Sequence, residues 1–126
     1  MGRIVLIAAI GVISAAPFDL SGAWEFEVDL GGIEIETNCN LSQDGSKLAG
    51  RCWATAGPYR YDTDATGTVD GDRMELSYWF PSDRGSVTFH YKGGREPDSS
   101  LAGDCTIVTG DKGDTARCIF TAARTR

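Results

Sequence analysis

The sequence is poor in the residues on which metal-dependent and hydrolytic enzymes depend. His90 is the single histidine among 126 residues, and it lies between Phe89 and Tyr91 on the polar face of its expected strand. A zinc site or a Ser-His-Asp system needs partners that this chain does not readily supply. The glycines fall in hairpin turns rather than in a phosphate-binding loop. These absences predict a protein that is not an enzyme and that holds no cofactor.

Acidic residues are plentiful, but their spacing does not favour a metal site. The segment Asp62-x-Asp64-x-Thr66-Gly67 resembles the start of a calcium loop, yet its twelfth position is Arg73, where a bidentate glutamate belongs. Other carboxylates alternate along strands, which is typical of a solvated face rather than of an acid and a base in a cleft. These are Glu25, Glu27, Glu34 and Glu36. We therefore expect no metal ion.

The chain also lacks an excess of positive charge and a membrane-spanning apolar run. Its 12 Lys and Arg residues stand against 18 Asp and Glu residues, which gives a net charge of −6. Nucleic acids and anionic membranes require a basic surface, so neither is an expected partner. The apolar run Ile4–Ile13 is too short to cross a bilayer as a helix.

The N-terminal segment has the pattern of a cleavable secretory signal. Basic Arg3 precedes the apolar run, and the small residues Ser14-Ala15-Ala16 follow it. We place cleavage after Ala15, so that residues 1–15 are a signal peptide and residues 16–126 form one domain. No cysteine lies near this site, so no lipid anchor is expected. The mature protein is predicted to be secreted or periplasmic and not inserted in a membrane, and the sequon at Asn40 matters only in a eukaryotic source.

Four cysteines form two pairs with the same spacing of thirteen, Cys39 with Cys52 and Cys105 with Cys118. The midpoint of each pair falls in a glycine-containing turn, at Asp44–Lys47 and at Gly110–Gly113. Residues equidistant from a hairpin turn face each other across the two strands, within disulfide reach. In a short exported chain this pattern predicts two cross-strand disulfides rather than a metal site.

The body of the chain reads as strands with no convincing amphipathic helix. Apolar and polar residues alternate between turn signals such as Gly31-Gly32 and Asp70-Gly71. Eight strands are expected: 24–30, 33–41, 48–55, 61–69, 74–80, 86–92, 101–108 and 117–124.

The expected registers place apolar side chains on one face of these strands. Pairing around Gly31-Gly32 sets Val28 opposite Ile35, and pairing around Asp70-Gly71 sets Tyr78 beside Thr63. The eight strands follow one another along the chain, share one apolar face and have no helix to cover it. They bury this face best by closing into an antiparallel up-and-down β-barrel. A two-sheet β-sandwich is the alternative fold.

Several segments resemble the calycin barrels, the group that contains lipocalins and avidins. Asp19-Leu20-Ser21-Gly22-Ala23-Trp24 resembles the Gly-x-Trp start of their first strand. The blocks 41–50, 67–72 and 120–124 are similar to a lipocalin-like domain of exported bacterial proteins. The resemblance implies that Arg124 stacks on Trp24 at the closed end of the barrel, as structural residues. The resemblance does not imply biotin binding, because this chain has Val28–Gly32 where avidins have the polar Asn and Ser residues that bind biotin.

Two functions follow from these expectations. The aromatic side chains of Tyr61, Tyr78, Phe80 and Tyr91 are expected to face inward near strand ends, where a barrel mouth suits a small hydrophobic or aromatic ligand. The alternative is an exported interaction protein with a packed core, such as a hydrolase or protease inhibitor. In that case Trp53 and Trp79, expected to face outward, form the partner patch. The oligomeric state is left open.

Overall fold

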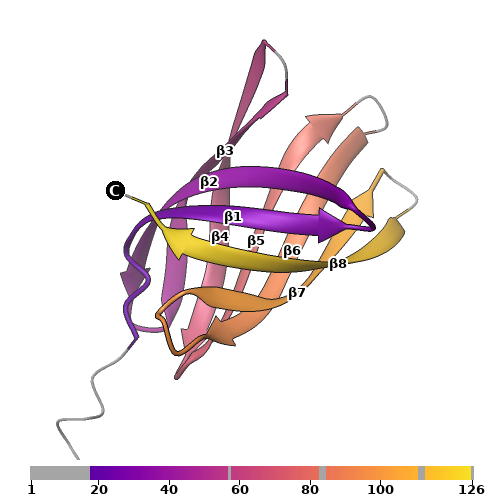
Figure 1. The fold of residues 1–126 in the computed structure, drawn as a ribbon. Coiled ribbons are helices and arrows are strands. Elements are labelled where there is room, and N and C mark those ends of the chain that lie inside the picture. Colours follow the sequence, from indigo (N-terminus) through magenta and orange to yellow (C-terminus); the bar gives the residue numbers. More distant parts are fainter. Residues whose placement is uncertain (1–17, 57, 83–84, 111–112, 126) are drawn as a thin grey trace, which may run out of the picture.

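The computed structural model describes residues 18–125 apart from 57, 83–84 and 111–112, and these residues form eight strands (Figure 1). The strands are β1 (Gly22–Leu30), β2 (Ile33–Asp44), β3 (Lys47–Ala56), β4 (Tyr59–Asp70), β5 (Arg73–Ser82), β6 (Gly85–Arg95), β7 (Leu101–Thr109) and β8 (Asp114–Arg124). Each strand predicted from the sequence is present, and each is longer than predicted. The predicted signal peptide lies outside the described residues. Within the described part of the chain, no helix has the length and apolar character needed to traverse a bilayer.

The strands form a closed antiparallel barrel in which each strand pairs with the next along the chain. The last strand, β8, returns to pair with β1, with Trp24 opposite Arg124 and Asp29 opposite Ile119. The predicted up-and-down barrel is therefore confirmed, and the β-sandwich alternative is wrong. Closure removes the two free edges that an open eight-stranded sheet would leave.

Both predicted disulfides are present and join neighbouring strands. Cys39 faces Cys52 across β2 and β3, with Cα atoms 4.0 Å apart. Cys105 faces Cys118 across β7 and β8, with Cα atoms 4.9 Å apart. The predicted registers of these two hairpins are thus confirmed. Paired cysteines of this kind are typical of proteins that fold in an oxidising, extracytoplasmic compartment.

One predicted register is wrong by two residues. The turn between β4 and β5 is formed by Gly71 and Asp72, not by Asp70 and Gly71, so Tyr78 pairs with Ala65 rather than with Thr63. Gly71 has a φ of +62°, which either turn position would tolerate. A shift of two residues keeps every side chain on its predicted face.

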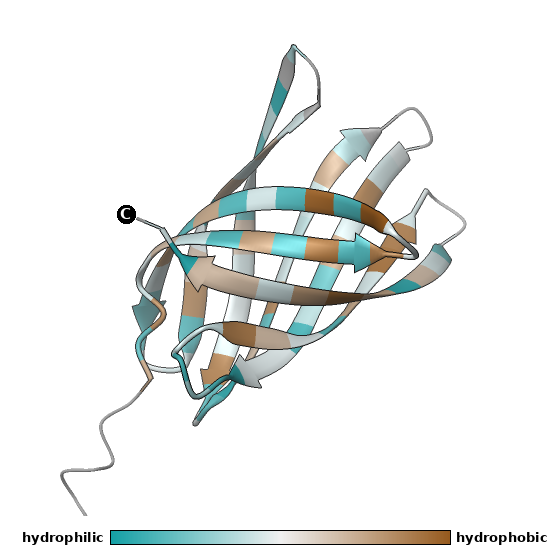
Figure 2. Ribbon diagram, viewed as in Figure 1, coloured by the Kyte–Doolittle hydropathy of each residue, from teal (hydrophilic) through white to brown (hydrophobic). Residues whose placement is uncertain are grey.

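The apolar face of the strands is turned inward. Figure 2 shows apolar and polar residues alternating along β1 and β2. Trp24, Phe26 and Val28 are buried, whereas Glu27 and Asp29 between and beyond them are exposed. The buried side chains from all eight strands form one continuous core.

Two glycines allow neighbouring strands to approach closely. A Cβ atom on Gly50 would lie 2.1 Å from the carbonyl oxygen of Asn40, and one on Gly103 would lie 2.3 Å from that of Lys92. Neither distance is compatible with a side chain, so these positions require glycine for cross-strand contact.

Candidate functional site

One end of the barrel is sealed by Trp24. Its indole is fully buried and donates a hydrogen bond from Nε1 to the carbonyl oxygen of Leu20, 2.9 Å away. The guanidinium of Arg124 lies over the indole, with Cζ 4.6 Å from the ring centroid. Arg124 also donates to the carbonyl oxygens of Ser21, at 2.8 Å, and of Asp19. The segment before β1 is thereby fixed across this end of the barrel, whereas the opposite end has no such cover among the described residues.

The Asp19 carboxylate belongs to the same arrangement. It accepts a hydrogen bond from the backbone N–H of Ser21, 2.9 Å away. This hydrogen bond, followed by that of the Ser21 hydroxyl and by the charge of Arg124, lowers the pKa of Asp19. The carboxylate orders the chain before β1 and does not face a cavity.

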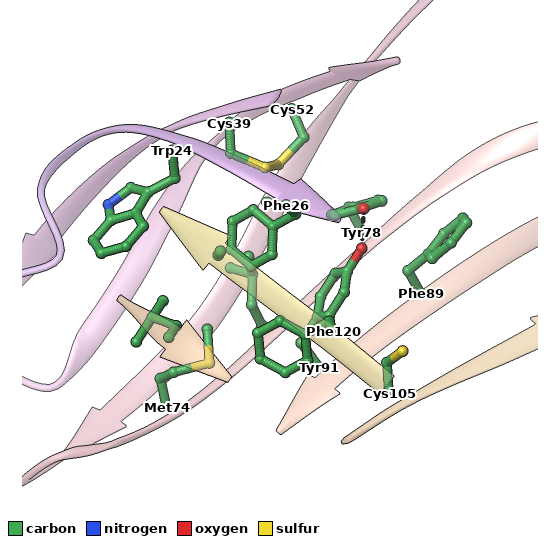
Figure 3. Close-up of a cluster of buried hydrophobic side chains, with 14 of the residues drawn as sticks. Trp24, Phe26, Cys39, Cys52, Met74, Tyr78, Phe89, Tyr91, Cys105 and Phe120 are labelled. Atoms are coloured by element: carbon green, nitrogen blue, oxygen red, sulfur yellow. Dashed lines mark hydrogen bonds between the residues drawn. A yellow bond between two sulfur atoms is a disulfide. The ribbon is translucent and has the colours of Figure 1, made fainter. Parts of the chain in front are cut away.

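Three of the four predicted ligand-binding residues lie in the core instead of lining a pocket. Tyr78, Phe80 and Tyr91 are 2%, 8% and 1% exposed. The Tyr78 ring centroid lies 5.3 Å from that of Phe80 and 5.5 Å from that of Tyr91. Phe26, Phe89 and Phe120 extend the cluster across the interior, where Figure 3 shows the rings packed beside the Cys39–Cys52 disulfide. The sequence prediction placed these side chains on the correct, inward face of their strands.

The two phenols form a buried polar contact within this cluster. The hydroxyls of Tyr78 and Tyr91 are hydrogen-bonded to each other (Figure 3). Burial raises the pKa of Tyr78 to about 12, against smaller opposing effects of Thr37 and Tyr91. Burial and the neighbouring Tyr78 also raise the pKa of Tyr91 well above its usual value. Both groups are therefore neutral at physiological pH and act as hydrogen-bonding partners, not as acids.

Thr37 is the polar neighbour of this pair on β2. Its side chain is fully buried, and its Oγ1 atom has no hydrogen bond of normal geometry within the described chain. It lies near enough to Tyr78 to favour ionisation of the phenol.

The fourth predicted residue, Tyr61, lies at the open end. Its side chain is 38% exposed, and its ring meets Phe80 edge-on at a centroid distance of 6.4 Å. Partly buried apolar residues pack against the core at the same end of their strands. They are Leu30, Ile35, Ala54 and Val87. The mouth of the barrel is thus apolar, with Tyr61 at its surface.

The two tryptophans of the predicted partner patch differ in exposure. Trp79 is 55% exposed. Trp53 is half-buried, because the guanidinium of Arg60 lies over its ring with Cζ 5.0 Å from the centroid. Arg60 in turn contacts Asp62 at 2.9 Å. Trp53 therefore packs within its own hairpin, and Trp79 is the more accessible of the two.

Ile33 completes the exposed apolar residues of the open end. At 63% exposure it is more accessible than Trp79, and it lies directly after the Gly31-Gly32 turn. Sequence reasoning did not single it out, because its alternation with Glu34 and Glu36 placed it with the inward residues. Its position as the first residue of β2, next to the turn, was the signal that its side chain lies at the rim of the open end.

The barrel wall is not fully paired at the open end. The β2–β3 ladder ends with Asn38 opposite Trp53, and the β4–β5 ladder ends with Ala65 opposite Tyr78. Beyond these pairs, residues 54–56 and 59–61 pair only with each other, and residues 62–64 pair only with residues 51–53 of β3. Figure 1 shows this projecting hairpin (residues 54–56 and 59–64) extending away from β5 and β6. The sequence analysis did not predict it.

Hollows on the outer wall are open and lined by both polar and apolar residues. One of about 690 Å³ lies between the Gly31-Gly32 turn and the outer face of β7 and β8, beside Arg117 and Ile119. Another of about 350 Å³ lies over β5 to β7. It includes exposed His90, whose Nδ1 lies 2.7 Å from Ser77 Oγ. No carboxylate among the described residues contacts that histidine, so the orienting acid of a catalytic triad is missing.

Acidic residues gather on the outer face of β1 and β2. One carboxylate oxygen from each of Glu25, Glu27 and Glu36 lies within 4.8 Å of the others on the outer face. The two aspartates of the calcium-like segment are engaged otherwise, because Asp64 contacts Arg51 at 2.9 Å and Asp62 contacts Arg60. That segment is a regular strand, not a loop.

Comparison with known proteins identifies the fold and not the family. No protein-family model matches the chain, and no curated protein does. A solved structure described as a redesigned β-barrel is similar to it, with a TM-score of 0.65 and 14% identical residues. The similarity covers 85% of this chain and 92% of that one. At this identity the likeness shows the barrel fold alone, and the resemblance to calycins stays a prediction.

Proposed function

We propose that this chain is an exported interaction protein that binds a protein partner with the open end of its barrel. The observation that carries the proposal is the distribution of exposed apolar residues. Of the four large ones among the described residues, Ile33, Tyr61 and Trp79 lie at the open end. Aromatic side chains of this kind are enriched at the centres of protein interfaces.

The packed interior supports this function over the binding of a ligand inside the barrel. Aromatic rings 5 to 6 Å apart and the Cys39–Cys52 disulfide occupy the space in which lipocalin-like barrels hold a ligand. The disulfides and the predicted signal peptide support export.

Affinity capture from the exported fraction of the source organism tests the proposal. The wild-type barrel and the variant Lys47→Ala, which removes an exposed side chain at the sealed end, are expected to retain the same protein. The double variant Tyr61→Ala/Trp79→Ala is expected to retain at least about tenfold less, as loss of interface anchors implies. Equal retention by all three, or no retention by any, contradicts the proposal.

A small hydrophobic or aromatic ligand at the mouth is the second candidate function. Tyr61 lies over Phe80, beside the partly buried Ala54 and Val87, and these side chains form an apolar surface with one hydroxyl. Native mass spectrometry of the unreduced protein from its own exported fraction tests it. A bound small mass supports the ligand, and a bare polypeptide argues against it.

A further inference from the structure

The open end contains an unpaired strand edge next to its exposed aromatic residues. Beyond the pair Ala65–Tyr78, no ladder pair among the described residues joins β4 to β5. We call this interval the open seam; it is bordered by Tyr59–Asp64 of β4 and by Trp79–Ser82 of β5. The β4 segment remains a regular strand, because it pairs along its other side with Arg51–Ala56 of β3.

The sequence gives a physical reason why the seam stays open. If the β4–β5 register continued, Pro81 would fall opposite Asp62. Proline has no N–H to donate, and it is therefore confined to edges and ends of strands. Pro81 instead pairs only with Ser86 on β6. The β5 side of the seam is thus protected against pairing, whereas the β4 side has no proline and remains able to pair.

We propose that the partner of this barrel contributes an extended strand that pairs with the free edge of β4 at Tyr59–Asp64. This mode, strand addition, uses main-chain hydrogen bonds for affinity and alternate side chains for specificity. It rests on the proposed function, since it specifies how the partner binds. The edge is already in strand conformation, so the barrel has little ordering entropy to lose on binding.

The side chains around the seam define the chemistry of the added strand. Toward the interior it meets Tyr61, Thr63 and Phe80, which favour an apolar or aromatic side chain. Toward solvent it meets Trp79 on one side and Asp62 and Asp64 on the other. A basic side chain suits this position, because it can stack on the indole and contact the carboxylates.

The carboxylates retain capacity for such a contact. In each existing ion pair only Oδ1 is engaged, by Arg60 in Asp62 and by Arg51 in Asp64. All four side chains are substantially exposed, so these pairs hold the acidic groups only weakly. The net charge of −6 adds a general attraction for a basic segment. The occupant is therefore an extended segment in which apolar and basic residues alternate.

Amide hydrogen exchange of the full mature barrel tests strand addition directly. The probe is an end-blocked peptide of alternating valine and lysine at millimolar concentration. Its binding is expected to slow exchange at those amides of Tyr59–Asp64 that point into the open seam and to leave the closed β1–β8 ladder unchanged. The same peptide N-methylated on alternate residues keeps its side chains but loses its donors, and it is expected to bind at least about tenfold more weakly. Absence of protection, or equal binding of the methylated peptide, overturns the proposal.

Failure of this mode and failure of the proposed function give different results. A partner that is retained through Tyr61 and Trp79, while the seam-facing amides of residues 59–64 exchange freely in the complex, overturns strand addition and leaves the function. Protection by the peptide without any retained partner supports the strand site and contradicts the function. Asp62→Asn/Asp64→Asn is expected to weaken peptide binding, whereas the matched control Asp104→Asn/Asp114→Asn, which removes two exposed carboxylates on β7 and β8, is not.

Discussion

The buried phenols of Tyr78 and Tyr91 make the stability of the barrel depend on pH. Burial raises the pKa of Tyr78 from 10.0 to about 12, so the folded state holds this proton more tightly than the unfolded chain does. The stabilising contribution is complete below the unfolded pKa near 10. It is lost as the pH rises through the folded value. Tyr91, whose pKa is raised in the same direction, adds to this effect.

We therefore expect alkaline destabilisation that Tyr78→Phe reduces. In urea titrations between about pH 8 and pH 12, the free energy of unfolding should fall less steeply in this variant than in the wild type. At neutral pH the variant should lose about 1 kcal/mol, because the Tyr91 hydroxyl loses its partner. The control Tyr61→Phe changes an exposed phenol and should keep the wild-type pH profile. Identical profiles for all three proteins would show that the buried pair does not control alkaline stability.

Arg124 is the residue on which the sealed end depends. Arg124→Ala removes the stacking on Trp24 and two hydrogen bonds to backbone carbonyls. Thermal unfolding should show a loss of about 1–2 kcal/mol, discounted for the exposure of the guanidinium. Arg117→Ala, which removes an outward-facing arginine, should be close to neutral. A neutral Arg124→Ala would mean that burial of Trp24 alone seals the barrel.

At the scale of elements, each disulfide fixes one hairpin of the barrel. Each bridge joins residues separated by 13 positions in adjacent strands. A loop of this length corresponds to about 2–3 kcal/mol of stability in the chain-entropy description. Reduction should therefore lower the free energy of unfolding by about 4–6 kcal/mol in total. Chemical denaturation with and without reductant measures this, and an unchanged midpoint would show that the bridges do not limit stability.

Hairpins were predictable from the sequence to different degrees. The β1–β2 register follows from Gly31-Gly32, and the β2–β3 register is fixed by Cys39 and Cys52, so local chemistry leaves one choice. Around Gly71, the sequence allows a turn at Asp70-Gly71 or at Gly71-Asp72, and packing in the folded barrel selects the second. The projecting hairpin forms because the β2–β3 and β4–β5 ladders end before the ends of their strands. Where a ladder ends depends on contacts between residues far apart in the sequence. Pro81 was the one local signal for it.

The sequence predicts which face of a strand each side chain of the candidate site lies on, but not how deep in the barrel that side chain lies. Alternation places Tyr78, Phe80 and Tyr91 inward, as found. Their distance from the mouth depends on how strands stagger around the closed barrel, and no short-range pattern encodes that stagger.

At the scale of the whole molecule, the outer wall carries unbalanced charge. Glu27 lies opposite Glu36, and Asp29 lies opposite Glu34, on β1 and β2. Like charges directly opposite one another in a sheet are destabilising. Among the described ion pairs, none involves these carboxylates. The wall thus favours solubility at a cost in stability.

Added salt should consequently stabilise the barrel by screening this repulsion. Thermal unfolding in increasing sodium chloride should show a rising midpoint, and Glu27→Gln should raise the midpoint at low salt by an amount equivalent to about 0.5 kcal/mol. Glu75→Gln is the matched control, because Glu75 lies opposite Lys92 and should not gain from neutralisation. A midpoint that is independent of salt would contradict this account of the acidic wall.

The pairing of β8 with β1 also determines when the protein can finish folding. Arg124 contacts a residue 103 positions earlier in the chain, so the barrel cannot close before the last strand has been synthesised. Until then β1 and the most recent strand present free edges that can aggregate. The Cys39–Cys52 disulfide, by contrast, lies within the hairpin of β2 and β3 and can form first. Stepwise C-terminal truncation should therefore abolish folding abruptly once β8 is shortened, while the Cys39–Cys52 disulfide still forms.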